Sequence, residues 1–315
     1  MSCVEPGCGG ASAAARVLPA RGPHDVAWLL AFLGAHAVAG VETWDGRTYA
    51  RSVSVEGRPQ VLRVRAHRDG VESLGTPDGD AAVVHLLGLH DDPSVAEAAL
   101  GRDAALGPLV RRRPGVRAPG SADHGETLVR TVIGQQVSLA AARTVTGRLV
   151  AEHGRPLPAH LVAPGGPTHL FPSPERLAGV DPASLPMPRA RGRTVVAVAG
   201  ALADDPGVVA DDATLLALPG VGPWTVDYVR LRTRRDPDVF LSTDLAVRRQ
   251  LSRLLPGPAA TARAVVAGWA PHRSLALVHL WADYLDGTHD DAHDDAHNGT
   301  PEDAPTAATG GAVPA

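Results

Sequence analysis

The chain has 315 residues, of which 44% are hydrophobic, and this is enough for one to three domains around a large core. It contains no apolar run long enough to span a bilayer and shows no secretory signal pattern. Its two cysteines, Cys3 and Cys8, are too few for a disulfide framework and make a poor zinc site. We therefore expect a cytoplasmic protein that does not contact a membrane.

The formal net charge of −4 hides an uneven distribution. Seven of the 34 acidic residues lie from Asp286 onward, where no basic residue occurs, which leaves 27 acidic against 30 basic residues in the rest of the chain. This mildly basic body is compatible with DNA binding but does not establish it. All 30 basic residues are arginine, which we attribute to a GC-rich coding bias.

The N-terminal part of the chain predicts a small domain of mixed structure. Residues 1–20 are rich in Ala, Gly and Pro, and we expect a disordered leader there. Within residues 21–92, Asp25 can cap a helix with one apolar side. The stretches 47–55 and 60–66 alternate with the period of a strand. An α+β domain with a mainly antiparallel sheet is the resulting prediction.

The segment 81–89 is apolar and fits either a strand or a helix. The pattern is helical over residues 93–286, with a connection at 111–113 and a Pro/Gly-rich loop at 154–174. The expected helices are 96–106, 126–133, 139–152, 174–180, 189–203, 211–218, 245–255, 259–269 and 272–285.

The tail, residues 287–315, contains the run HDDAHDDAH. Alternating His and Asp can bind a metal ion, but nothing holds this run in shape. We therefore expect a disordered, solvated tail.

Two polar residues, Gln135 and Gln136, interrupt the helical pattern, and Ser138 can cap the helix that follows. From spacing alone, a solvated loop is the favoured interpretation of this corner.

The most informative stretch is LPGVGPWTVDYV, residues 218–229. Gly220 and Gly222 bracket Val221 and allow a sharp turn that can approach another molecule closely. Pro223 suits the first turn of the next helix. Backbone N–H groups at such a helix start bind anions, and because no P-loop pattern accompanies them, a nucleic-acid phosphate is the favoured ligand.

Asp244 follows this hairpin, 22 residues after Gly222. Taken alone, Ser242, Thr243 and Asp244 before Leu245 form a good capping sequence for a helix, and an ordinary N-cap would be the favoured interpretation.

The hairpin, Trp224 directly after it, and Asp244 at this spacing together resemble the helix-hairpin-helix DNA glycosylase superfamily. Within it, GVGPWTVDYV with Phe240 and Asp244 is similar to the AlkA-type 3-methyladenine DNA glycosylases (type II). The similarity runs from about residue 24 to residue 286. It implies an α+β fold with a small N-terminal antiparallel-sheet domain and a two-lobed, all-helical body that carries the hairpin.

The resemblance also implies a function, namely the excision of alkylated purines such as 3-methyladenine and 7-methylguanine in base excision repair. Such an enzyme extrudes one nucleotide from double-stranded DNA and binds its base. A carboxylate then stabilises the positive charge on the sugar as the C1′–N bond breaks. Asp244 matches this catalytic carboxylate, and Thr243 stands where many relatives have a second acid. We expect a monomer that acts on DNA in the nucleoid.

Four aromatic residues match the base pocket of the AlkA type, and electron-rich rings attract a cationic purine. The residues that the resemblance assigns to this pocket are Trp224, Tyr228, Trp281 and Phe32. Those that it assigns to DNA binding are Gly220, Val221, Gly222, Thr225, Gln135 and Gln136. Gln136 falls at the position of the side chain that fills the gap left by the extruded nucleotide, where relatives can carry leucine.

Some relatives also cut DNA through a lysine amine, but Trp224 occupies the corresponding position and the chain contains no lysine. We therefore expect no lyase activity. An iron–sulfur cluster is excluded because four C-terminal cysteines are lacking. We expect no required cofactor and no catalytic metal, although the carbonyls of residues 216–221 could bind a structural monovalent cation.

Two alternatives remain open. Hairpins of this kind also occur in DNA-binding proteins that are not enzymes. A glycosylase for a different lesion, such as a mismatched, deaminated or oxidised base, is the second alternative.

Overall fold

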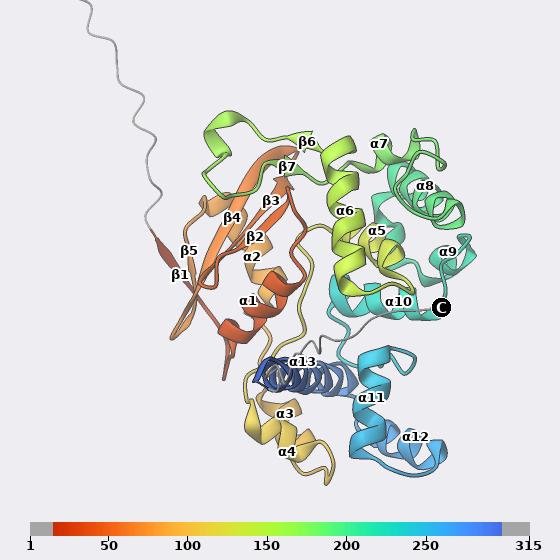
Figure 1. Cartoon of the computed structure of the whole chain (residues 1–315). Coiled ribbons are helices and arrows are strands. Elements are labelled where there is room, and N and C mark those ends of the chain that lie inside the picture. The colour runs from red at the N-terminus through yellow and green to blue at the C-terminus, as the bar shows by residue number, and fades with distance from the viewer. Residues whose placement is uncertain (1–14, 298–315) are drawn as a thin grey trace, which may run out of the picture.

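The computed structural model describes residues 15–297, and side chains up to residue 286. A sheet domain lies on one side and a helical body on the other, as Figure 1 shows. This arrangement confirms the predicted α+β fold. Along the described part of the chain, none of the helices combines the length and the apolar character needed to cross a bilayer.

The sheet is antiparallel, with its strands in the order β1-β5-β4-β3-β2. The strands are β1 (Arg16–Pro19), β2 (Glu42–Trp44), β3 (Thr48–Val55), β4 (Arg58–His67) and β5 (Gly70–Ser73). Glu56 and Gly57 form the two-residue turn between β3 and β4, with φ of 50° and 77°. Positive φ at both positions is what a tight hairpin needs to match the twist of its strands.

Strand β1 corrects the prediction of a disordered leader over residues 1–20. It pairs with β5, with Arg16 opposite Ser73, and the Arg16 side chain forms an ion pair with Asp80. The strand is only four residues long and adjoins the Ala/Gly-rich stretch, so composition concealed it. Residues 1–14 of the predicted leader lie outside the described residues.

The helices are α1 (Val26–Ala35), α2 (Asp80–Leu87), α3 (Ser94–Leu100), α4 (Gly107–Arg112), α5 (His124–Gly134), α6 (Leu139–His153), α7 (Pro174–Ala178), α8 (Arg189–Asp204), α9 (Asp212–Ala217), α10 (Pro223–Val229), α11 (Leu245–Leu254), α12 (Ala259–Gly268) and α13 (Arg273–His297). Short 3-10 helices are η1 (Pro77–Gly79), η2 (Ala159–Leu161) and η3 (Pro206–Ala210), and η4 (Arg230–Arg234) is a turn of π-helix that continues α10. Two-residue strands β6 (Arg155–Pro156) and β7 (His169–Leu170) pair within the expected loop 154–174.

Several capping residues act as the sequence predicts. Asp25 accepts a hydrogen bond from Trp28 N (2.9 Å), and Ser138 accepts one from Ala141 N (3.2 Å). These bonds satisfy backbone donors that a helix start otherwise leaves unpaired.

The stretch 96–106 is not the single helix that its apolar pattern predicts. It divides into α3 and a turn, because Asp103 accepts hydrogen bonds from Ala105 N and Leu106 N and so begins a new segment. Arg111 and Arg112, expected in a connection, belong to α4. The undecided segment 81–89 is helical as α2.

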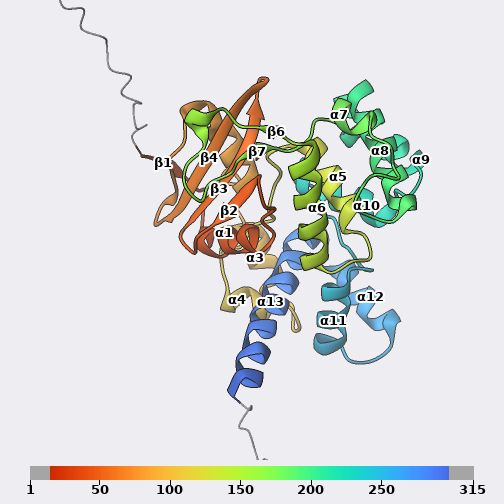
Figure 2. The same cartoon turned by 45° about the horizontal axis from the view of Figure 1, so that its top comes forward.

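The helical body has two lobes that differ in how they are built (Figures 1 and 2). Helices α5–α10 surround a core of their own, which includes Leu128, Val198 and Leu215. Helices α3, α4, α11 and α13 instead share one continuous core with α1 and the sheet. The hairpin between α9 and α10 belongs to the first lobe, and Asp244 begins α11 in the second.

Helix α13 corrects the prediction of a disordered tail from residue 287, because its backbone continues as a helix to His297. The run HDDAHDDAH forms these last turns of the helix. Residues 298–315 of the expected tail lie outside the described residues.

Candidate active site

The hairpin depends on its two glycines in different ways. Gly220 has a φ of +80°, and a Cβ at this position would collide with Thr194 Oγ1 of α8. Gly222 is extended, with φ −119° and ψ 176°, and a Cβ there would meet nothing within 4 Å. Gly220 therefore shapes the turn and packs it against the protein, whereas Gly222 faces open space that another molecule can approach.

The polar corner between α5 and α6 is linked to this hairpin through Gln135. Its Nε2 donates to Gly220 O (3.0 Å) and to Thr225 Oγ1 (2.9 Å), and Thr225 is buried. Gln136 has a φ of +55° and its side chain is exposed at the corner. The corner and the hairpin therefore hold one another in place, a role of Gln135 and Thr225 that spacing alone did not show. Contact of these residues with DNA stays a prediction.

The four predicted pocket aromatics lie together, although they come from α1, α10 and α13. The ring centroids of Trp224 and Tyr228 are 5.4 Å apart and the rings are stacked. The ring centroid of Trp281 lies 6.2 Å from those of both Tyr228 and Phe32. Trp28 and Trp269 are buried, and Trp44 is partly buried and packs against the core.

A cavity of about 270 Å³ opens beside these rings. Its lining includes Phe32, Trp224, Tyr228 and Asp244, as well as the apolar residues Val137 and Leu139 beside the corner between α5 and α6. Trp281 is 8% exposed and supports the cluster without lining the cavity. The volume lies at the small end of ligand pockets, which suits a compact planar group.

Asp244 is both the predicted N-cap and a wall of this cavity. Its Oδ1 accepts a hydrogen bond from Val247 N (3.1 Å) and lies 3.4 Å from the donor Trp281 Nε1. Both contacts use the same oxygen, and within the described part of the chain no group donates to Oδ2. The carboxylate is thus fixed in orientation by α11 and α13 while one oxygen stays available.

Several residues of the cavity were not predicted from the sequence, among them His36 and Arg232, which contact the pocket aromatics. His36 stacks on Phe32 with ring centroids 4.2 Å apart. The Arg232 guanidinium lies 5.5 Å from the Tyr228 ring centroid, and its Nη1 donates to the Tyr228 hydroxyl (2.7 Å). Each lies one helical turn after an aromatic residue that the resemblance identified, and this i, i+4 spacing is the signal that could have found them.

A buried cluster of charges contributes Glu42, Arg51 and Arg130 to the lining of the cavity. Arg51 of β3 contacts Glu126 of α5 (2.6 Å), and Arg130 contacts Glu126 (2.8 Å) and Glu42 of β2 (2.9 Å). The hydroxyl of Tyr49 donates to Glu42 (2.6 Å). Burial opposes ionisation of Glu42, but Arg130 and Arg51 hold its pKa below the usual value. The cluster joins the sheet to the first helical lobe.

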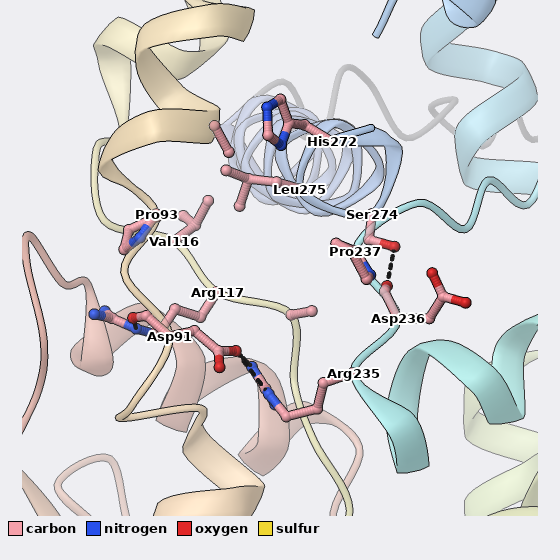
Figure 3. Close-up of a pocket in the computed structure, with 12 residues that line it drawn as sticks. Asp91, Pro93, Val116, Arg117, Arg235, Asp236, Pro237, His272, Ser274 and Leu275 are labelled. Carbon is pink, nitrogen blue, oxygen red and sulfur yellow. Dashed lines mark hydrogen bonds and ion pairs between the residues drawn. The ribbon is translucent and has the colours of Figure 1, made fainter. Parts of the chain in front are cut away.

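Figure 3 shows a second cavity, of about 250 Å³, at the joint between the α2–α3 connection, the end of η4 and the start of α13. Arg235 crosses this joint, with its Nε donating to Asp91 (2.7 Å). Asp244 and the predicted pocket aromatics do not line this cavity. Within the described residues, no group of three or more His, Cys, Asp and Glu side chains could hold a metal ion.

The fold that carries this site is that of the DNA glycosylases with a helix-hairpin-helix motif. A solved 3-methyladenine DNA-glycosylase from Archaeoglobus fulgidus superimposes with a TM-score of 0.73 at 19% identity, over 85% of this chain and 97% of that chain. An 8-oxoguanine glycosylase/lyase of Clostridium acetobutylicum, solved with DNA, gives a TM-score of 0.64 at 14% identity, over 79% of this chain and 89% of that one.

Sequence comparison is more specific. The family model of the AlkA N-terminal domain matches residues 15–123, from the start of β1 to the N-cap of α5. The DNA-3-methyladenine glycosylase 2 of Escherichia coli (strain K12) is 34% identical over 292 residues, which cover 85% of this chain and 96% of that protein. The chain therefore belongs to the AlkA-type DNA-3-methyladenine glycosylase family.

A longer relative also matches. The "Probable bifunctional transcriptional activator/DNA repair enzyme AlkA" of Mycobacterium tuberculosis (strain ATCC 25618 / H37Rv) is 39% identical over 281 residues. These cover 84% of this chain but 56% of that protein, so the chain spans little more than half the length of this relative.

Proposed function

We propose that the protein is a monofunctional DNA glycosylase that removes alkylated purines, such as 3-methyladenine and 7-methylguanine, in base excision repair. The observation that carries this proposal is the position of Asp244, which lines a cavity of about 270 Å³ beside a cluster of aromatic rings. Membership of the AlkA family supports it. The proposed substrate is double-stranded DNA, bound by a monomer in the cytoplasm, at the nucleoid.

Binding starts at two exposed elements of the first lobe. In this proposal the open side of the hairpin at Gly222 receives a DNA phosphate on the backbone N–H groups that begin α10. Gln136 enters the duplex where the damaged nucleotide leaves it. Filling the gap in this way lowers the cost of unstacking, which is a few kcal/mol for one base. The bonds from Gln135 to the hairpin keep these two contacts in a fixed relation.

The extruded base then occupies the cavity against Trp224 and Tyr228. An alkylated purine carries a positive charge, which makes it a good leaving group and favours contact with electron-rich rings. The base departs with the electron pair of the C1′–N bond and leaves positive charge on the sugar. The Asp244 carboxylate stabilises this charge, orients the water that attacks C1′, and accepts the proton that this water loses. Because Val247 N donates a hydrogen bond to Oδ1, we assign the contact with the sugar and the water to Oδ2.

The test replaces Asp244 with asparagine, which keeps the size and can still cap α11. Methylated duplex DNA is incubated with each protein, and the released bases are separated by chromatography. We expect D244N to lose at least about 100-fold in the single-turnover rate of base release, the scale of removing one fixed electrostatic group. Binding to DNA with an abasic site should remain.

A matched control is Asp211→Asn. Asp211 also caps a helix, accepting from Ala213 N and Thr214 N at the start of α9, and it does not line the cavity. D211N should release bases at the wild-type rate. Equal rates for wild type and D244N would refute the assignment of Asp244, and a wild-type protein that binds DNA without releasing any base would identify a non-catalytic DNA-binding protein.

The proposed enzyme has no lyase activity, since the chain has no lysine to form a Schiff base with the sugar. A covalent enzyme–DNA adduct through a side chain of residues 15–297, trapped by borohydride, would contradict this. The reaction as proposed requires no cofactor. The monovalent cation at the carbonyls of residues 216–221 stays a prediction, and one of these carbonyls, that of Gly220, accepts a hydrogen bond from Gln135.

A deaminated purine is the second candidate substrate. Arg232 places a positive charge 5.5 Å from the Tyr228 ring centroid, which disfavours a cationic base on that ring and favours a neutral base with a carbonyl group. Duplex DNA with one deoxyinosine, assayed beside methylated DNA, distinguishes the two by which base is released faster.

A further inference from the structure

His36 is the C-cap of α1 and presents one ring nitrogen to the protein. Its Nδ1 lies 2.7 Å from Phe32 O. A carbonyl oxygen only accepts hydrogen bonds, so the hydrogen of this contact belongs to Nδ1. In a neutral imidazole the other nitrogen, Nε2, then carries a lone pair and acts as an acceptor.

The ring is neutral at physiological pH. Burial lowers the pKa of His36 to about 4, the nearby Arg232 and Arg130 cations act in the same direction, and the Phe32 carbonyl and Glu42 oppose them only in part. Protonation would add a further cation near the guanidinium groups of Arg232 and Arg130. Burial of the ring and the two nearby arginines therefore keep Nε2 unprotonated and able to accept a hydrogen bond.

The stacked rings of His36 and Phe32 line the same cavity as Trp224, Tyr228 and Asp244. Two donors near this cavity are engaged within the protein: Arg143 Nε donates to Ala37 O (2.9 Å), and Arg130 Nη2 donates to the His36 carbonyl (3.0 Å). In the described part of the chain, no group donates to His36 Nε2. The cavity thus offers an acceptor that the fold itself does not use.

We propose that His36 is a specificity-determining residue, whose Nε2 accepts a hydrogen bond from an N–H or amino group on the edge of the extruded purine. This inference rests on the function proposed above. The positive charge of an alkylated purine polarises its N–H groups and strengthens such a bond. The contact selects bases that have a donor on this edge, and it aligns the base in the cavity while Asp244 acts at the sugar.

The test compares His36→Phe, which keeps a ring on Phe32 but has no acceptor, with His36→Gln, which restores an acceptor through its amide oxygen. Single-turnover release of 7-methylguanine from duplex DNA is measured, together with binding to the same duplex carrying an abasic site. We expect H36F to lose about three- to tenfold in the release rate, the value of one net hydrogen bond. H36Q should recover most of this loss. Neither variant should change the affinity for abasic DNA, which has no base to contact.

His24→Phe is the matched control, because the His24 ring also contacts a backbone carbonyl, Arg68 O (3.0 Å), and does not line the cavity. H24F should behave as wild type in both assays. An unchanged release rate in H36F, an equal loss in H36Q and H36F, or a parallel loss of abasic-site binding would each overturn the role of His36. Failure of the wild type to release any methylated base would overturn the proposed function, and this inference with it.

Discussion

Trp281 contributes both a ring and a hydrogen-bond donor to the site. Its ring contacts Phe32 and Tyr228, and its Nε1 lies 3.4 Å from Asp244 Oδ1. Trp281→Phe keeps a ring and removes the donor, so the carboxylate loses a contact that helps to fix its orientation. We expect the single-turnover rate of base release to fall about three- to tenfold.

Trp269→Phe is the control for this prediction. Trp269 is also buried, and its Nε1 has no hydrogen-bond partner in the described part of the chain. Both substitutions remove the same volume from the core, but only the one at Trp281 changes a contact with Asp244. Similar release rates in the two variants would show that the indole N–H does not assist the carboxylate.

The resemblance assigned residues of the hairpin motif and two distant aromatics, Phe32 and Trp281, to the pocket, but it did not include every residue that reaches the cavity through packing. Asp244, Trp224 and Tyr228 belong to the hairpin sequence and its spacing, so the resemblance identified them. His36 is the C-cap of α1 and Arg232 lies in η4, and the tertiary fold brings both to the lining of one cavity. The periodicity of a single helix shows which side is apolar, but it does not show which other helix faces that side.

The hairpin is the element in which a small change should separate stability from DNA binding. In Gly220→Ala the new Cβ collides with Thr194 Oγ1. The alanine must also keep the φ of +80° that this turn requires. We expect G220A to lower the free energy of unfolding by about 1–2 kcal/mol or more, the cost of a left-handed residue with a side chain. Urea denaturation followed by circular dichroism measures this.

Gly222→Ala is the matched change on the open side of the same turn. Its Cβ meets no protein atom within 4 Å and needs no positive φ, so the free energy of unfolding should stay within about 0.5 kcal/mol of wild type. If the phosphate approaches here, G222A should still weaken binding to abasic-site DNA. A variant that binds as tightly as wild type would place the DNA contact elsewhere.

The predicted bounds of several elements were wrong where a specific contact outweighed the hydrophobic pattern or the composition of the segment. The apolar stretch 96–106 is broken by the side chain of Asp103, which bonds to two backbone amides. Strand β1 exists because β5 offers it a partner, a long-range contact that four residues cannot reveal by themselves. The last turns of α13 extend a helix that begins in the core, although their own composition favours disorder.

The whole molecule is joined more tightly than a division at residue 92 suggests. The sheet, α1 and α13 share one core, and Arg235 links the end of η4 to Asp91 after α2 (Figure 3). The resemblance predicted the architecture, including the two lobes. It did not predict that the C-terminal lobe completes the core of the N-terminal domain, because contacts between distant segments leave no periodic signal in either.

The buried cluster of Arg51, Glu42, Glu126 and Arg130 connects the sheet to the first helical lobe. Arg51→Met replaces a cationic side chain with an uncharged one of similar length. Two buried carboxylates, Glu42 and Glu126, then share a single arginine, Arg130. We expect the free energy of unfolding to fall by about 3–5 kcal/mol, since breaking a buried pair strands its partner charge. Chemical denaturation at neutral pH measures the difference.

Arg58→Met provides the comparison at the surface, where Arg58 and Glu56 are paired but their side chains remain 68% and 81% exposed. Water already solvates both charges there, so R58M should change stability by less than about 1 kcal/mol. If R51M proved no more destabilising than R58M, the ion pairs of Arg51 would not contribute to holding the sheet and the first helical lobe together. The cavity would then tolerate the loss of Arg51 from its lining, and base release by R51M should match wild type.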